Sequence, residues 1–391
     1  MLNTSLSPWP SFTQEEADAV SKVLLSNKVN YWTGTECREF EKEFAAFAGT
    51  QYAVALSNGT LALDVALKAM GIGAGDDVIV TSRTFLASAS CIVTAGANPV
   101  FADVDLNSQN ISAETIKAAL TPNTKAVIVV HLAGMPAEMD GIMDLAKEHD
   151  LWVIEDCAQA HGAKYKGKSV GSIGHVGAWS FCQDKIMTTG GEGGMVTTND
   201  KELWSKMWSY KDHGKSYDAV YHREHAPGFR WLHESFGTNW RMMEIQAVIG
   251  RIQLKRMPEW TARRQAHAAK LAESLGKFAS IRLIEIADYI EHAQYKFYAF
   301  VKPEHLKEGW TRDRIVNELN ARKVPCYQGS CSEVYLEKAF DNTPWRPKER
   351  LKNAVELGDT SLMFLVHPTL TDDEIAFCKE HIEAVLAEAT A

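Results

Sequence analysis

The feature that most constrains the fold is a regular alternation between short, continuously apolar segments and segments of helical period. Apolar runs occur at residues 77–81, 100–103, 126–131 and 151–155. They are apolar throughout rather than at every second residue, which indicates strands that are buried on both faces, as in the centre of a mostly parallel sheet. Alternation of such strands with helices predicts an α/β fold with a three-layer arrangement.

The helical segments carry their own end signals. Phe40 and Phe44 share one helix face, and Gly49 follows that helix. A glycine just beyond the last periodic residue is typical of a helix C-terminus, because glycine adopts the left-handed conformation without strain. The segment at 61–70 repeats this pattern and ends at Gly71. We therefore expect helices between the strands of the sheet.

The pattern changes in the second half of the chain. A segment near 242–278, rich in Ala, Gln, Arg and Lys, has the character of one long helix. The remainder contains a strand candidate at 295–301 and a helix that begins after Thr371 with a capping-box signature. We predict a large domain over 1–250 and a smaller C-terminal α+β domain over 251–391, joined by the long helix.

Composition excludes several classes of protein. With 41 Lys and Arg against 50 Asp and Glu, the net charge of −9 does not favour binding to nucleic acid or to an anionic membrane. No apolar run approaches the ~20 residues of a membrane span, and the N-terminus lacks a signal-peptide pattern. The 7 cysteines follow neither a disulfide framework nor zinc-ligand spacing. We therefore expect a cytoplasmic protein with reduced thiols and no metal site.

Two acidic residues mark the end of a predicted strand. Glu155 and Asp156 close the apolar run that begins at Leu151. In open parallel sheets, ligands bind outside the carboxyl ends of the strands, so Asp156 lies where chemistry usually occurs. An aspartate at this place would equally serve to cap the next segment. This feature alone leaves a functional and a structural interpretation open.

A lysine lies between a strand-like run and a glycine-rich turn. Lys185 has apolar neighbours at Phe181 and Ile186, and glycines are frequent over 190–194. A lone lysine is usually a solvated surface residue, but desolvation favours the neutral, nucleophilic amine. Glycines let the backbone approach a cofactor closely. The run has neither dinucleotide-fingerprint nor Walker A spacing, which disfavours a nicotinamide oxidoreductase.

A third element precedes the predicted helix at 61–70. Its sequence is Ser57-Asn58-Gly59-Thr60. The free N–H groups and the dipole of a helix N-terminus form a site for a phosphate dianion. Ser57 or Asn58 would equally act as a plain N-cap.

Together these features fit one cofactor, pyridoxal phosphate. Its chemistry needs a lysine for the Schiff base, an anion site for the 5′-phosphate, a stacked aromatic ring and a carboxylate that keeps the pyridine nitrogen protonated. These groups are supplied, in the same order, by Lys185, the segment 57–60, Phe85 and Asp156.

The chain also resembles a known family, the DegT/DnrJ/EryC1/StrS sugar aminotransferases of the aspartate-aminotransferase fold (fold type I). The matching motifs extend over nearly the whole chain, at 30–34, 57–60, 129–134, 155–162, 180–194, 237–242 and 364–368.

The resemblance implies a role for each matching residue. Lys185 would form the Schiff base and, once released, move a proton between C4′ of the cofactor and the substrate carbon. Asp156 would pair with the pyridinium nitrogen, and Gln159 would lie near O3′. The remaining cofactor contacts implied are Phe85 on the ring and Gly59, Thr60 and Ser180 at the phosphate.

The family pattern also implies a partner. Asn239 matches an asparagine that reaches the phosphate from the second subunit, which implies a homodimer with composite sites. A loop cap is the structural alternative. The stretch 213–236 is rich in aromatic and basic residues, contains Arg230 and His233, and is followed by Arg241. These three residues are candidate ligands for an anionic substrate. Ordinary loop packing and solvated charge are the alternative for each of them.

We therefore predict a pyridoxal-phosphate-dependent aminotransferase. An amino acid, with L-glutamate as the expected donor, would convert the cofactor to pyridoxamine phosphate. The amine would then pass to a keto or aldehyde carbon of a nucleotide-linked keto-deoxy sugar used for a surface polysaccharide, such as lipopolysaccharide, or another glycan. The alternatives are a free octulosonate-type sugar acid as acceptor, a pyridoxamine-dependent ketosugar dehydratase, and a catalytically idle cofactor-binding regulator. Lysine at position 185 disfavours the dehydratase, because that branch of the family has histidine there.

Overall fold

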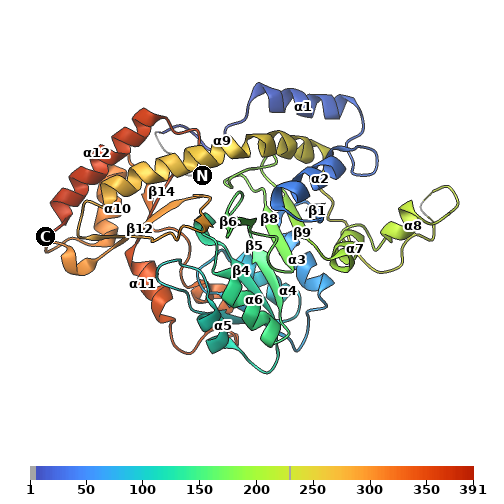
Figure 1. Cartoon of the computed structure of the whole chain (residues 1–391), viewed down its shortest axis with the longest axis horizontal. Helices are drawn as coiled ribbons and strands as arrows, with labels where there is room; N and C mark the ends of the chain where they lie inside the picture. Colours follow the sequence, from blue (N-terminus) through green and yellow to red (C-terminus); the bar gives the residue numbers. More distant parts are fainter. Residues whose placement is uncertain (1–5, 229) are drawn as a thin grey trace.

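A seven-stranded sheet forms the centre of the molecule (Figure 1). The computed structural model describes residues 6–228 and 230–391. The strand order is β1-β9-β8-β5-β4-β2-β3. β9 runs antiparallel to both neighbours and the other pairings are parallel, which confirms the predicted mostly parallel sheet. The strands are β1 (Tyr52–Leu56), β2 (Asp77–Thr81), β3 (Asn98–Ala102), β4 (Thr124–Val130), β5 (Trp152–Asp156), β8 (Val176–Ser180) and β9 (Gly194–Thr198).

Helices cover both faces of this sheet, so the fold has three layers. Val78 and Val80 of β2 pack into one hydrophobic cluster, whereas Ile79 packs into another. Successive side chains of a strand point to opposite faces, and this alternation explains why the central strands are apolar throughout. The first cluster includes residues of α3 (Gly59–Ala69), α4 (Ala87–Thr94) and α7 (Lys201–Tyr210). The opposite face is covered by α5 (Ala113–Ala119), α6 (Met139–Glu148) and α2 (Glu36–Ala48).

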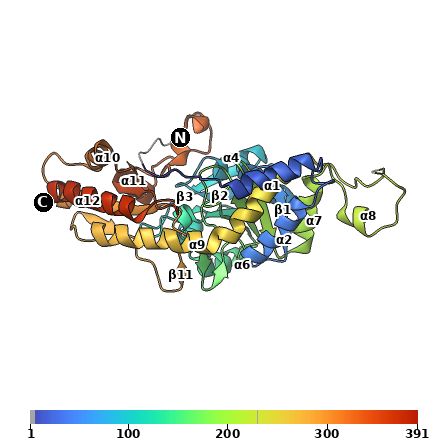
Figure 2. The same cartoon turned by 90° about the horizontal axis from the view of Figure 1, so that it is seen from above.

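One long helix, α9 (Glu244–Leu275), runs along the molecule in both views (Figures 1 and 2). The N-terminal helix α1 (Gln14–Leu25) lies beside its first half, where the amide of Gln253 donates to Glu16 at 2.8 Å. The second half packs into a separate hydrophobic cluster with the C-terminal elements. The predicted division of the chain near residue 250 stays a prediction.

The C-terminal part is built on a four-stranded antiparallel sheet, in the order β10-β12-β14-β13. The capping box before α12 is present: the hydroxyl of Thr371 accepts from the backbone N–H of Glu374 at 3.1 Å. The elements are β10 (Ile281–Leu283), β12 (Phe297–Val301), β13 (Cys326–Tyr327), β14 (Ser361–Phe364), α10 (Arg312–Ala321), α11 (Lys352–Thr360) and α12 (Asp372–Ala389).

Residues 213–228 and 230–236 belong to an arm that extends away from the body and contains the short helix α8 (Tyr217–Tyr221) (Figures 1 and 2). Trp231 and Phe236 of this arm are 93% and 99% exposed. A small third sheet joins β6 (Lys164–Tyr165), β7 (Lys168–Ser169) and β11 (Ile290–Glu291). Across the described residues, we find no helix with the length and apolar character that crossing a membrane requires.

Candidate active site

A cavity of about 670 Å³ opens at the carboxyl ends of the central strands. Its walls come from the start of α3, the loop before α4, the ends of β5 and β8, and the turn that follows β8. The cofactor residues predicted for this chain's own site all line this cavity: Gly59, Thr60, Phe85, Asp156, Gln159, Ser180 and Lys185.

The phosphate end of the predicted site is the N-terminus of α3. The side chain of Asn58 accepts from Leu61 N at 3.0 Å, so Asn58 is the N-cap. A Cβ atom at Gly59 would lie 2.5 Å from the Cβ of Ser180, and one at Gly194 would lie 2.2 Å from the carbonyl oxygen of Asn58. Glycine is therefore required at both places for the backbones to meet. The resulting cradle of helix N–H groups beside the Ser180 hydroxyl fits a phosphate group.

Asp156 also lines the cavity and is 6% exposed. Its carboxylate accepts from the hydroxyl of Ser88 at 2.8 Å and from Ala158 N at 3.1 Å. Burial raises the pKa of Asp156, against the lowering effect of these bonds and of Lys185. A buried carboxylate with two neutral donors is poorly compensated. The protonated ring nitrogen of pyridoxal phosphate would supply the missing positive charge, so this residue also fits the cofactor.

Glu155, the preceding residue, serves a structural role. Its carboxylate accepts from His131 Nε2 at 2.9 Å and from the backbone N–H groups of Gly171, Ile173 and Gly174 at 2.9, 2.8 and 2.6 Å. Burial would raise the pKa of Glu155, but the bonds from His131 and the backbone lower it overall.

His131 in turn is fixed by the chain. Its Nδ1 accepts from Ala137 N at 3.0 Å, so Nε2 carries the hydrogen and donates it in a hydrogen bond to Glu155. His131, Glu155 and Cys157 have donor atoms within 4.8 Å of one another, a spacing that a metal ion would accept. Both ring nitrogens of His131 are already used, however, and this cluster is explained as a buried hydrogen-bond network.

Gln159 is held by its oxygen. Its Oε1 accepts from Ala133 N at 2.8 Å, so the amide nitrogen remains to donate. A donor at the cavity wall suits the predicted position near O3′ of the cofactor, because O3′ is an acceptor.

Lys185 projects from the turn after β8, and its side chain is 17% exposed. Its Nζ lies 3.8 Å from Asp184 Oδ1 and 5.4 Å from the ring centroid of Tyr295. The Tyr295 hydroxyl donates to the other oxygen of Asp184. Burial alone would raise the pKa of Asp184, but Lys185 and Tyr295 lower it overall. The turn therefore gives the lysine an acidic and an aromatic neighbour.

The remaining predicted residues lie outside the cavity. Asn239 is exposed, and its backbone pairs with Asp212. Arg230 and His233 are exposed on the arm. Arg241 donates to the buried carboxylate of Asp212 at 2.7 Å, so its guanidinium is engaged in an ion pair within the chain. The substrate roles of these residues stay predictions. Phe85 lines the cavity, but 71% of it is exposed.

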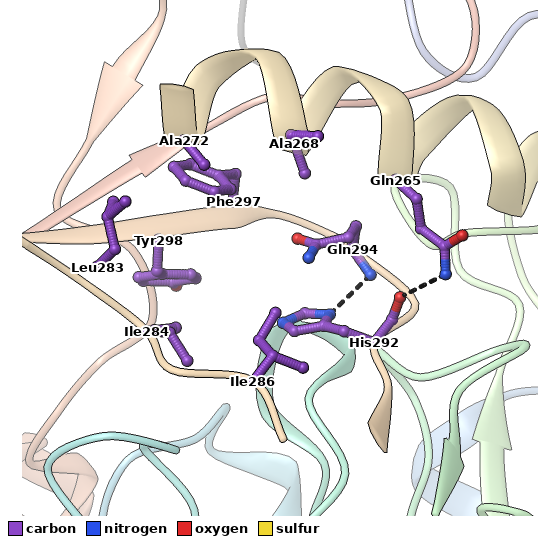
Figure 3. Close-up of a pocket in the computed structure, with 11 residues that line it drawn as sticks. Gln265, Ala268, Ala272, Leu283, Ile284, Ile286, His292, Gln294, Phe297 and Tyr298 are labelled. Atoms are coloured by element: carbon purple, nitrogen blue, oxygen red, sulfur yellow. Dashed lines mark hydrogen bonds between the residues drawn. The ribbon is translucent and has the colours of Figure 1, made fainter. Parts of the chain in front are cut away.

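A second cavity of about 220 Å³ lies between α9 and the C-terminal sheet (Figure 3). Its lining is mostly apolar, with His292 among its few polar residues. The Nδ1 of His292 accepts from Gln294 N at 2.9 Å, and burial lowers the pKa of His292 to about 3, which keeps the ring neutral. The residue after Gln294 in this wall is Tyr295, whose ring lies 5.4 Å from Lys185 Nζ.

Comparison with known proteins identifies the family. Residues 10–383 match the DegT/DnrJ/EryC1/StrS aminotransferase family. The chain is 42% identical over 377 residues to GDP-perosamine synthase from Escherichia coli O157:H7, covering 95% of this chain and 96% of that protein. It is 41% identical over 363 residues to UDP-N-acetyl-3-dehydro-alpha-D-glucosamine 3-aminotransferase from Acidithiobacillus ferrooxidans, covering 91% and 90%.

A solved structure agrees with this result. The X-ray structure of the aminotransferase from Psychrobacter cryohalolentis is 65% identical, covers 98% of this chain and 99% of that one, and superposes with a TM-score of 0.96. The resemblance noted from sequence motifs, the enzyme class and the cofactor are thereby confirmed. The chain belongs to the DegT/DnrJ/EryC1/StrS aminotransferase family and is a pyridoxal-phosphate-dependent sugar aminotransferase.

Proposed function

We propose that this protein transfers the amino group of L-glutamate to a keto carbon of a nucleotide-linked keto-deoxy sugar during surface polysaccharide biosynthesis. The observation that carries the proposal is the convergence of Lys185, Asp156 and Gln159 on one cavity beside a phosphate cradle. The names of two relatives, GDP-perosamine synthase and a UDP-linked 3-aminotransferase, support a nucleotide sugar as the acceptor.

Pyridoxal phosphate, when bound, supplies the electron sink that amine transfer requires. Asp156 would hold the proton of the ring nitrogen, and Gln159 would donate to O3′. Lys185 would anchor the cofactor and then carry the proton at the substrate carbon. The phosphate and the ring face would be held by Gly59, Thr60, Ser180 and Phe85.

We test this proposal first by absorption spectroscopy. Pyridoxal phosphate added to the purified protein should give the band of the lysine-linked cofactor, and L-glutamate should bleach it. Lys185→Ala should abolish the band and reduce turnover by about 10⁴-fold, because it removes both the anchor and the proton carrier. Lys185→Arg keeps the charge and should be equally inactive. A band that persists in Lys185→Ala would overturn the assignment of Lys185.

The acceptor is tested separately, with GDP-, UDP- and dTDP-linked keto sugars beside a free octulosonate-type sugar acid. We expect glutamate-dependent amination of a nucleotide-linked sugar, detected by mass. Amination of the free acid alone would replace the acceptor class. Ammonia release with loss of oxygen from the sugar would indicate the dehydratase, and a bleached band with no acceptor product from any of these compounds would contradict the proposed acceptor.

We further propose a homodimer in which Asn239 of one copy completes the site of the other. The exposed Asn239 and the exposed Trp231 and Phe236 of the arm support this arrangement. Arg230 and His233 would then face the partner's substrate. Co-expression of Lys185→Ala with Asn239→Ala should recover part of the activity that each variant lacks alone, because mixed dimers contain one intact site. No recovery would contradict the composite site.

A further inference from the structure

The segment before α1 connects the C-terminal part of the molecule to the turn that carries Lys185. We call residues 6–10 the N-terminal strap. Ser7 donates to Glu374 Oε1 through its backbone N–H at 2.6 Å and through its hydroxyl at 3.0 Å. The hydroxyl of Thr369 donates to the carbonyl of Pro8 at 2.8 Å. The strap is thus fastened at one end to the start of α12.

At its other end, the strap reaches the lysine. The indole N–H of Trp9 donates to the backbone carbonyl of Lys185 at 2.8 Å. Among the described residues, the other backbone hydrogen bond of Lys185 joins its N–H to Cys182 O at 3.1 Å, within the turn itself. The Trp9 bond therefore holds the plane of the peptide group that follows Lys185, and that plane restricts the direction in which the side chain leaves the turn.

The ring of Trp9 is itself firmly placed. It packs edge-on against Trp260 of α9 at 5.1 Å, and the guanidinium of Arg264 lies 5.0 Å from its centroid. Arg264 is 1% exposed and donates to the carbonyl of Tyr295 at 3.3 Å, so the aromatic face provides favourable contact for a buried cation. A donor on such a rigid support can hold its acceptor within the narrow limits that a reacting group needs.

We infer that Trp9 is a positioning residue for Lys185. Through Trp9, the strap links the position of the C-terminal part to the orientation of the Lys185 amine. The inference rests on the proposed function. Trp9 does not line the cavity. It acts through the peptide carbonyl, so its loss should alter the reaction at Lys185 rather than the binding of substrates.

The test replaces the donor and keeps the ring. Trp9→Phe retains an aromatic face for Arg264 and lacks the N–H, and Trp260→Phe is the matched control in the same aromatic cluster. The first readout is the rate at which added pyridoxal phosphate forms its band with the full-length, cofactor-free protein. The second is a single turnover with L-glutamate. We expect both rates to fall about tenfold in Trp9→Phe and to stay near wild type in Trp260→Phe, with an unchanged donor KM.

A second variant keeps the inference testable if Trp9→Phe fails to fold. Thr369→Val removes the half-buried hydroxyl that bonds Pro8 and His367, and it loosens the strap at a residue outside the cavity lining, so it should slow the same two rates by a smaller factor. Equal rates in wild type, Trp9→Phe and Thr369→Val, or equal losses in Trp9→Phe and Trp260→Phe, would overturn the inference and leave the proposed function standing. Absence of the band in the wild type would instead remove the proposed function, and this inference with it.

Discussion

Two adjacent carboxylates at the end of β5 lie on opposite faces of the sheet and have very different hydrogen-bond partners. Glu155, on the face away from the cavity, receives two donors on each oxygen, one of them from His131. Asp156, on the cavity face, receives two neutral donors, from Ser88 and Ala158. Both groups are buried, yet the pKa of Glu155 is lowered by its partners whereas burial raises the pKa of Asp156.

This difference supports a structural role for Glu155 and the proposed functional role for Asp156. Burial of a charge is costly unless the protein compensates it fully. The chain compensates Glu155 with its own groups. We propose that it leaves Asp156 for a cation that arrives from outside, which the protonated nitrogen of the cofactor would be. The four predictions below test this contrast.

The largest expected effect is on catalysis. Asp156→Asn removes the charge that we propose would keep the ring nitrogen protonated, so kcat should fall by about 10³-fold. Glu155→Gln is the matched control, because it makes the same change one residue earlier and should retain near-wild-type turnover per bound cofactor. The measurement is single-turnover bleaching with L-glutamate, normalised to cofactor content. Equal losses in the two variants would break the contrast.

The next effect is on stability, and here Glu155→Gln rather than Asp156→Asn should show the loss. Glu155→Gln leaves fewer acceptor sites for the N–H groups of Gly171, Ile173, Gly174 and His131, and it breaks a buried pair. The free energy of unfolding at pH 7 should fall by about 3 kcal/mol. Urea unfolding of the cofactor-free protein measures this, with Asp156→Asn as the control that should lose nothing. A fully stable Glu155→Gln would refute the structural role.

The third prediction concerns pH in the cofactor-free protein. The lowered pKa of Glu155 means that its stabilising contribution is present above its unfolded pKa of about 4.3 and is lost as pH falls. The raised pKa of Asp156 means that ionisation destabilises the fold as pH rises above about 3.9. Asp156→Asn should therefore be more stable than wild type at pH 7, and this advantage should shrink toward pH 4. An advantage that grows on acidification would contradict the raised pKa.

How far the sequence predicts these features depends on whether their cause is local. The run at 77–81 coincides with β2, and Asn58 acts as the cap that its type and place predict. Strand periodicity and caps are decided within a few residues. The family motifs likewise predicted residues that the fold brings to one cavity.

The sequence did not reveal the neighbours of Lys185. Trp9 and Lys185 are 176 positions apart, and Tyr295 and Asp184 are 111 apart. No local period specifies which remote side chain will meet a given turn. The roles proposed for Arg230 and His233 involve a second copy of the chain, so neither local pattern nor the single chain decides them. The engagement of Arg241 with Asp212 was equally hidden, because a basic residue in an aromatic stretch has the same pattern whether it is paired or free.

The smallest predicted effect sharpens the contrast within the cavity face. The Ser88 hydroxyl is one of the two donors to Asp156, at 2.8 Å, and it also contacts the hydroxyl of Thr84 at 2.8 Å. Ser88→Ala removes this donor while the carboxylate stays, so the pKa of Asp156 should rise further in the cofactor-free protein. A hydrogen bond to a charged group contributes about 1.5 kcal/mol or more, so kcat should fall by about tenfold. Thr84→Val is the control, because it removes the hydroxyl next to Ser88 without touching Asp156. If kcat fell as far in Ser88→Ala as in Asp156→Asn, the serine hydroxyl rather than the carboxylate charge would be the decisive group on this face.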